Sequence, residues 1–112
     1  MYGIEVREYV SVTMVELRGE LDLFSVADLR EALNRVLGLS RPALVDLSGI
    51  TFLDLQAARE LVLRYQLHAD HLTLSNPSRW VSASIEAFGL GAWIHFHPRS
   101  DSNDPQLFSG VS

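Results

Sequence analysis

The sequence predicts an α/β domain with a mixed, mostly parallel sheet of about five strands, led by a β-hairpin and covered by three main amphipathic helices. Three observations predict this fold class. Short apolar runs alternate with segments of helical periodicity, in the order β-β-α-β-α-β-α-β. The length of 112 residues suits one compact core. The composition, 47% hydrophobic and 21% charged, is that of a folded globular chain.

The first two runs are expected to pair as an antiparallel hairpin, with strands over residues 4–10 and 12–17. Gly19, just after the second run, indicates a bulge or a bend. The inward side of the second strand is expected to carry Val12, Met14 and then Val15 or Leu17.

The first helix is expected to begin at Ser25, which forms a near capping box with the acidic Asp28 three positions later. Gly38 is the candidate left-handed residue that ends this helix. The buried face is defined by apolar residues at helical spacing: Leu29, Ala32, Leu33, Val36 and Leu37.

A central strand is expected at residues 43–47, because this run is mostly apolar. Residues 48–49 are expected to turn the chain, and residues 50–53 to continue it in extended form. Asp54 is then a candidate N-cap for a helix from Leu55 to about residue 69. The expected apolar face of this helix carries Ala58, Leu61, Val62 and Tyr65, and the expected polar set is Arg59, Glu60, Arg64 and Gln66.

The last third of the chain predicts a short strand at 72–74, a third helix and a final strand at 93–96. Asn76 and Pro77 are expected to supply the cap and first position of the helix, and Gly89 its end. The apolar face of that helix carries Val81, Ile85 and Phe88.

The domain is expected to span residues 1–98 and to be followed by a polar tail of residues 99–112, with one short helical turn. Leu107 and Phe108 in that tail are expected to dock on the domain or on a second copy of it. An exposed Trp80 would indicate an interface.

Composition limits the function. A formal net charge of -5 argues against general nucleic-acid binding and against docking on anionic lipid, which need a basic face. No apolar run approaches the length of a membrane span, no secretory signal is visible, and cysteine is absent, so a cytoplasmic location is the simplest. The histidine pairs 68/71 and 95/97 lack further converging ligands, and no nucleophile–base or phosphate-loop motif is present. We therefore expect neither a metal, nor a cofactor, nor catalysis.

The ordered motifs of the chain resemble the STAS domain, the fold of bacterial anti-sigma-factor antagonists. The resemblance runs from about Val12 to Phe96. It is carried by Gly19-Glu-Leu-Asp22, the helix opened by Ser25, Leu44-Val-Asp-Leu47, Ile50-Thr-Phe-Leu-Asp54, Asn76-Pro77 and Phe88-Gly-Leu90. It implies a single STAS-like domain that binds a serine-kinase-type anti-sigma factor, or a related regulator, and is switched off by phosphorylation.

The sequence departs from the family at the phospho-acceptor. The family's pattern reads roughly Asp-Ser-Ser-Gly-Leu, whereas this chain reads Asp54-Leu-Gln-Ala-Ala58. Leu55 has no hydroxyl to phosphorylate, so the resemblance implies partner binding without this switch. Ser48 and Thr51 are candidate substitute acceptors, Thr51 being the more structural of the two. The resemblance gives these candidate partner-binding residues: Asp22, Leu23, Ser25, Asp54, Leu55, Gln56, Ala57 and Arg59.

Several interpretations stay open. Asp54 could act only as a helix cap and Asp22 only as the end of a strand. Leu55 could anchor a partner or pack into the core. A second hypothesis is a structural subunit that self-associates, as a homodimer or in a larger regulatory complex, through Leu55, Leu107 and Phe108. A third is a nucleotide or anion sensor at the helix start near Asp54.

Overall fold

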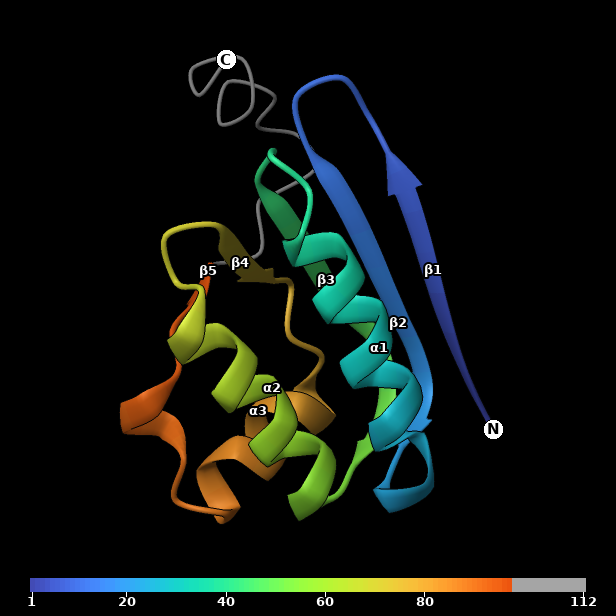
Figure 1. Ribbon diagram of the computed structural model, residues 1–112. Helices are drawn as coiled ribbons and strands as arrows, with labels where there is room; N and C mark the ends of the chain where they lie inside the picture. The colour runs from blue at the N-terminus through green and yellow to red at the C-terminus, as the bar shows by residue number, and fades with distance from the viewer. Residues whose placement is uncertain (98–112) are drawn as a thin grey trace, which may run out of the picture.

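The computed structural model describes residues 1–97, which form a five-stranded sheet in the order β1-β2-β3-β4-β5 (Figure 1). The strands are β1 (Tyr2–Glu8), β2 (Thr13–Leu21), β3 (Ala43–Leu53), β4 (Leu72–Ser75) and β5 (Phe96–His97). β1 pairs with β2 in antiparallel register, and the other neighbours are parallel. The predicted fold class is therefore confirmed. The predictions for residues 99–112 lie outside the described residues.

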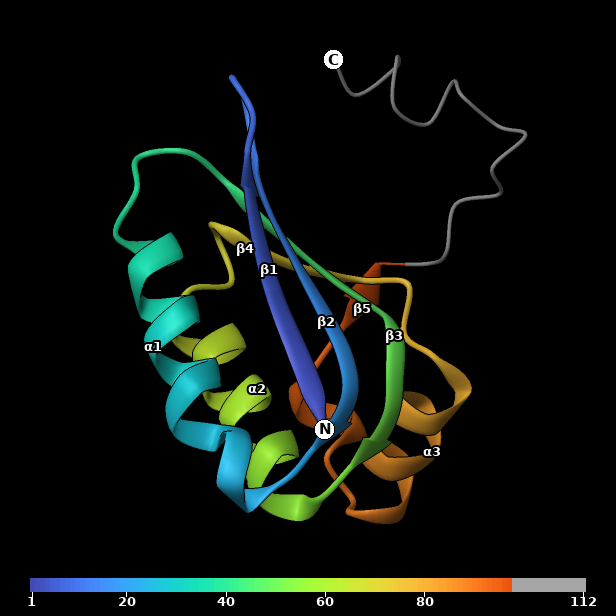
Figure 2. The ribbon, with the colours of Figure 1, turned by 90° about the vertical axis from the view of Figure 1, so that its right-hand side faces the viewer.

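Three helices pack on this sheet: α1 (Val26–Leu37), α2 (Leu55–Leu67) and α3 (Arg79–Ala87). α1 and α2 lie side by side on one face, and α3 lies against the C-terminal half of β3 (Figures 1 and 2). Two 3-10 turns, η1 (Leu23–Ser25) and η2 (Gly91–Trp93), lie outside the helices. Because η2 includes residue 93, the final strand begins at Phe96 and not at the predicted residue 93. No helix within residues 1–97 combines the length and apolarity that a bilayer crossing needs.

The core lies between the sheet and the helices and follows the alternation of the strands. In β2 the fully buried side is Thr13, Val15 and Leu17, so the expected inward positions Val12 and Met14 were wrong. Apolar residues occupy both the even-numbered and the odd-numbered positions of this segment, so the hydrophobic pattern alone cannot show which side of the strand faces the core. The opposite face of β1 and β2 carries Glu5, Arg7, Glu16 and Arg18, joined by ion pairs of 3.2–3.3 Å.

β3 runs through residues 48–49 without the predicted turn. Two irregularities in its pairing with β2 place an extra residue in β3 before Gly49 and another before Phe52. Such bulges change the side that each later residue faces. Buried positions therefore become three apart, at Leu47, Ile50 and Leu53, while both residues between Ile50 and Leu53 are exposed. The second irregularity lies at Gly19, whose φ of +82° fits the predicted bulge.

Two helix ends also differ from the prediction. Gly38 ends α1 in a right-handed conformation, with φ at −77°, and its N–H bonds back to the helix. The cap of α3 is Ser78, whose hydroxyl accepts from the N–H of Val81 at 3.2 Å. The same hydroxyl donates to the Ile50 carbonyl at 2.7 Å, which ties α3 to β3. Asn76, the expected cap, instead turns the chain with a φ of +52°.

Candidate partner-binding site

The site lies where β2 and β3 end side by side. Leu21 and Leu53 are register partners at the C-terminal ends of the two parallel strands. The N–H of Asp54 donates to the Leu21 carbonyl at 3.0 Å, one residue beyond this pair. The connections that follow, η1 after β2 and the start of α2 after β3, are therefore adjacent, as expected for neighbouring parallel strands.

Asp54 joins these two connections through both of its carboxylate oxygens. Its Oδ1 accepts from the N–H of Ala57 at 2.9 Å, which confirms the predicted N-cap of α2. Its Oδ2 accepts from the N–H of Leu23 at 2.9 Å, in η1. One side chain thus caps a helix and holds a neighbouring turn, a role that the sequence did not predict.

Asp22 and Ser25 hold the inside of η1. Asp22 Oδ1 accepts from the N–H of Phe24 at 3.0 Å, and the N–H of Asp22 donates to Ser25 Oγ at 2.8 Å. Ser25 Oγ donates in turn to the Asp22 carbonyl at 2.8 Å and is fully buried. The predicted capping box of Ser25 with Asp28 was wrong, because Asp22, three residues earlier, completes the box with Ser25.

Asp28 has a different partner. It accepts a hydrogen bond from the Tyr2 hydroxyl, so α1 contacts β1 at the sheet edge. This bond and the negative charge of the carboxylate raise the pKa of the Tyr2 phenol, because both favour the protonated form.

The outside of the junction is apolar. Leu23 is 59% exposed and Phe24 87% exposed, and Leu55, the first residue of α2, is half-buried. We call these three residues the loop surface. Gln56 and Arg59 beside it are exposed, whereas Ala57 is fully buried and faces the core. The candidate residues therefore divide into exposed side chains and side chains that support them from within.

Phe24 was missed at the sequence level. The candidate partner-binding residues include Leu23 and Ser25, on each side of it, but not Phe24 itself. Its signal was an aromatic residue directly after Asp22 and Leu23, in a turn too short to bury it. Phe52 was missed for a related reason, because the bulge in β3 that leaves it 50% exposed is not visible in the hydrophobic pattern.

The two substitute hydroxyls lie on β3 and not in the loop surface. Ser48 and Thr51 are both exposed, and the N–H of Ser48 donates to Asp46 Oδ1 at 3.0 Å. Both precede Asp54, so neither occupies the position of Leu55 at the start of α2. Whether either one is phosphorylated stays a prediction.

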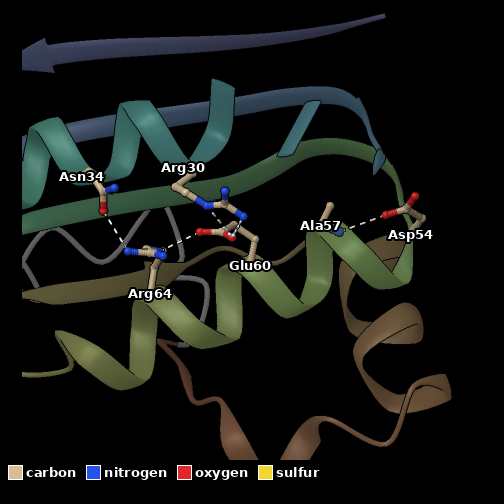
Figure 3. A network of polar contacts seen from close by, with 6 residues as sticks. All are labelled: Arg30, Asn34, Asp54, Ala57, Glu60 and Arg64. Carbon is tan, nitrogen blue, oxygen red and sulfur yellow. Dashed lines mark hydrogen bonds and ion pairs between the residues drawn. The ribbon is translucent and has the colours of Figure 1, made fainter. Parts of the chain in front are cut away.

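A buried carboxylate locks α1 to α2 behind the junction (Figure 3). Glu60 is 4% exposed and accepts from Arg30 at 3.0 Å and from Arg64 at 2.6 Å. Arg64 also donates to Asn34 Oδ1 at 2.9 Å. Glu60 belongs to the predicted polar set of α2, but the structure buries it away from solvent. It lies on the side of α2 that meets α1, where two guanidinium groups compensate the cost of burying its charge.

Residues 1–97 contain no group of three His, Asp or Glu side chains placed to share a metal ion. A shallow hollow of about 420 Å³ is formed by α3 and the segment that leads to β5, and not by the junction. Its lining is Ser82, Ile85, Glu86, Gly89, Gly91, Ile94 and Phe96. The junction itself presents apolar side chains, two of them exposed, on a hydrogen-bonded base.

Comparison with known proteins agrees with the fold. The family model described as "Mlab, STAS domain" matches residues 4–95. No curated protein sequence matches the chain significantly.

Several solved structures are similar to this chain. An anti-sigma factor antagonist from Mycobacterium paratuberculosis has a TM-score of 0.76 at 21% identity, over 100% of this chain and 96% of that one. Unphosphorylated SpoIIAA, an anti-sigma factor antagonist from Bacillus, has a TM-score of 0.69 at 20% identity, over 98% and 99% of the two chains. A STAS domain protein from Planctomyces limnophilus has 0.70 at 18%, over 97% and 98%. At these identities the likeness concerns the fold.

Proposed function

This chain belongs to the STAS domain family, and from that premise we propose that it is a non-catalytic protein-interaction module. Its partner is a serine-kinase-type anti-sigma factor or a related regulator, bound through the loop surface and the exposed start of α2. The solved folds that it resembles include anti-sigma factor antagonists, which supports a regulatory partner of this kind. The binding takes place in the cytoplasm.

The observation that carries the proposal is the exposure of Phe24. An aromatic ring that is 87% exposed gains little from folding and much from being covered by a partner. Its backbone is held in place, because Asp22 binds the N–H of Phe24 and Asp54 binds the N–H of Leu23. A pre-ordered turn loses less conformational entropy on binding than a flexible loop does.

Leu55 supports binding that does not respond to ATP. It occupies the first position of α2, where a phosphate would meet the positive end of the helix dipole. Leucine offers no hydroxyl there, so the partner interface cannot be released by phosphorylation at this residue. Its half-buried side chain instead adds an apolar group at the start of α2, the helix that neighbours η1.

The test is a titration of the purified chain with kinase-type anti-sigma factors from its source, by calorimetry, with and without MgATP. Phe24→Ala is expected to weaken binding by about tenfold to a hundredfold, the range of an interface aromatic. Leu67→Ala is the matched control, because Leu67 is also exposed, at 60%, but lies at the other end of α2. Equal affinities of Phe24→Ala and the unaltered chain would contradict the proposed surface.

Phosphorylation is tested in the same mixtures by mass spectrometry. We expect no phosphate on the unaltered chain and the same affinity with MgATP as without it. Leu55→Ser is expected to accept phosphate and then to lose the partner, because the charge is added within the interface. Phosphate on Ser48 or Thr51 of the unaltered chain would overturn the ATP-independent part of the proposal and leave the binding surface standing.

A second candidate is a structural subunit of a larger regulatory complex, or a homodimer, held through Leu55. The missing hydroxyl favours it, because a constitutive subunit needs no release. The contacts expected from Leu107 and Phe108 lie outside the described residues. An anion sensor finds less support, because the N–H groups of Leu23 and Ala57 are already bonded to the Asp54 carboxylate.

A further inference from the structure

β1 forms one edge of the sheet, and no other described element lies beyond it (Figures 1 and 2). We propose that this edge is a self-pairing surface, at which a second copy of the chain adds its own β1 in antiparallel orientation with Val6 opposite Val6. The proposal is independent of the partner surface at η1 and α2. It assigns a dimer contact that involves neither Leu55 nor the tail.

The hydrogen bonds between β1 and β2 show which backbone groups face the open edge. The N–H of Glu20 donates to the Met1 carbonyl at 3.0 Å, and the N–H of Tyr9 donates to the Val12 carbonyl at 2.9 Å. In an antiparallel pair the bonded residues alternate, so the odd-numbered residues of β1 bond to β2. The N–H and C=O groups of the even-numbered residues, Tyr2, Ile4, Val6 and Glu8, therefore point to the open edge.

This alternation restricts how a second β1 can pair. In the dimer, a two-fold axis relates the two β1 strands. If this axis passes through a residue, the residues whose backbone N–H and C=O groups point to the open edge lie opposite one another in the two copies. If it passes between two residues, they do not. An axis at Val6 joins Val6 to Val6 and Ile4 to Glu8 by backbone hydrogen bonds. The result is a continuous sheet across two copies, formed by strand addition at an edge.

Charge selects Val6 as the axis. With Val6 at the centre, Glu5 of each copy lies directly opposite Arg7 of the other copy. An axis at Glu5 or at Arg7 would set like charges against each other, and an axis at Ile4 would leave both without an opposite charge. Charged residues usually protect an edge strand from pairing, but here their order makes them self-complementary in this register.

The surrounding side chains favour the same contact. Glu5 and Arg7 are 41% and 49% exposed, so both can reach across the edge. They already form ion pairs with Glu16 and Arg18, and the dimer would join this group to the same group of the second copy. On the other face Ile4 and Val6 pack against the core but remain partly exposed, and pairing would cover them further.

The test uses two charge variants of the full chain, Glu5→Lys and Arg7→Glu, in sedimentation velocity over a range of concentrations into the millimolar. The unaltered chain is expected to form a concentration-dependent dimer. In a dimer of either variant alone, residues 5 and 7 carry like charges and face each other at two places. Each variant is therefore expected to weaken the dimer by at least about tenfold. An equal mixture of the two variants is expected to recover it. In the mixed dimer the introduced lysine faces the introduced glutamate, and the retained Arg7 of one copy faces the retained Glu5 of the other.

The mixture separates the contact from a loss of stability, since a variant that merely folds poorly gains nothing from the other. Circular dichroism melting of each variant confirms folding before mixing. Phe24→Ala is the matched surface control and is expected to dimerise like the unaltered chain. A chain that stays monomeric at all concentrations would overturn the proposal. A dimer that survives in either variant alone, or fails to return in the mixture, would also overturn it.

Discussion

Replacing Asp54 by alanine should release two parts of the site at once. The carboxylate holds the N–H of Ala57 and the N–H of Leu23, each at 2.9 Å, so the change removes the N-cap of α2 and the attachment of η1 together. Asp54→Asn is the informative companion. An asparagine keeps one acceptor oxygen for the helix cap but turns an NH₂ group toward the second N–H.

The expected costs follow from these contacts. Loss of an N-cap side chain costs about 1 kcal/mol of unfolding free energy. Loss of the second bond costs about 1 kcal/mol more, less than is usual for a bond to a charged group, because the N–H of Leu23 is accessible to water. We therefore expect about 2 kcal/mol for Asp54→Ala and about 1 kcal/mol for Asp54→Asn.

Urea unfolding followed by circular dichroism measures both differences. With a typical slope, a loss of about 2 kcal/mol lowers the midpoint by about 1 M. Asp46→Ala is the matched control, because its carboxylate accepts a single N–H within its own strand, from Ser48, and we expect it to cost at most about 0.5 kcal/mol. Equal stability of Asp54→Ala and Asp46→Ala, or of Asp54→Asn and the unaltered chain, would refute the double role of Asp54.

Four further predictions concern other parts of the fold. Glu60→Gln should lower the unfolding free energy by about 1–3 kcal/mol in the same assay, because the buried amide cannot accept from both guanidinium groups; an unchanged midpoint would contradict this. Gly19→Ala should cost more than about 1 kcal/mol, because its φ is +82° and the new Cβ would lie 2.4 Å from a main-chain oxygen. Gly38→Ala, at a φ of −77°, should cost nothing or stabilise. The raised pKa of Tyr2 means that its bond to Asp28 stabilises the fold below the usual phenol pKa of 10.0 and is lost as pH rises through the raised value. The difference in unfolding free energy between the unaltered chain and Tyr2→Phe should therefore be constant at neutral pH and shrink in strong alkali.

The order of elements and the helix cap at Asp54 could be predicted, because both depend on local patterns. The alternation of short apolar runs with helical periodicity indicates a mixed sheet without any knowledge of contacts. An aspartate between a strand and a helical pattern is a strong cap signal. The second bond of Asp54, to Leu23, could not be predicted, since it joins residues 31 positions apart.

The incorrect predictions share one physical cause. The local sequence pattern does not determine burial, strand pairing or capping partners at these residues, and the tertiary contacts do. Glu60 resembles a surface residue by type, and only the approach of Arg30 from α1 makes its burial favourable. The bulges in β3 depend on the pairing with β2, and they determine that Phe52 is exposed. Ser25 does occupy the N-cap position of α1, but its side chain makes no capping bond to that helix, because its hydroxyl is bonded to the backbone of Asp22 in η1.

The structural role of Asp54 changes what its presence implies about function. In the family pattern an aspartate precedes the phosphorylated residue, so its retention beside Leu55 invites interpretation as a remnant of the switch. Yet its two hydrogen bonds fix η1 and α2 whether or not a hydroxyl follows. The fold alone is sufficient reason for the aspartate, so it carries no information about a kinase. The proposal of a partner surface therefore rests on the exposed Leu23 and Phe24 and on the half-buried Leu55, and not on Asp54.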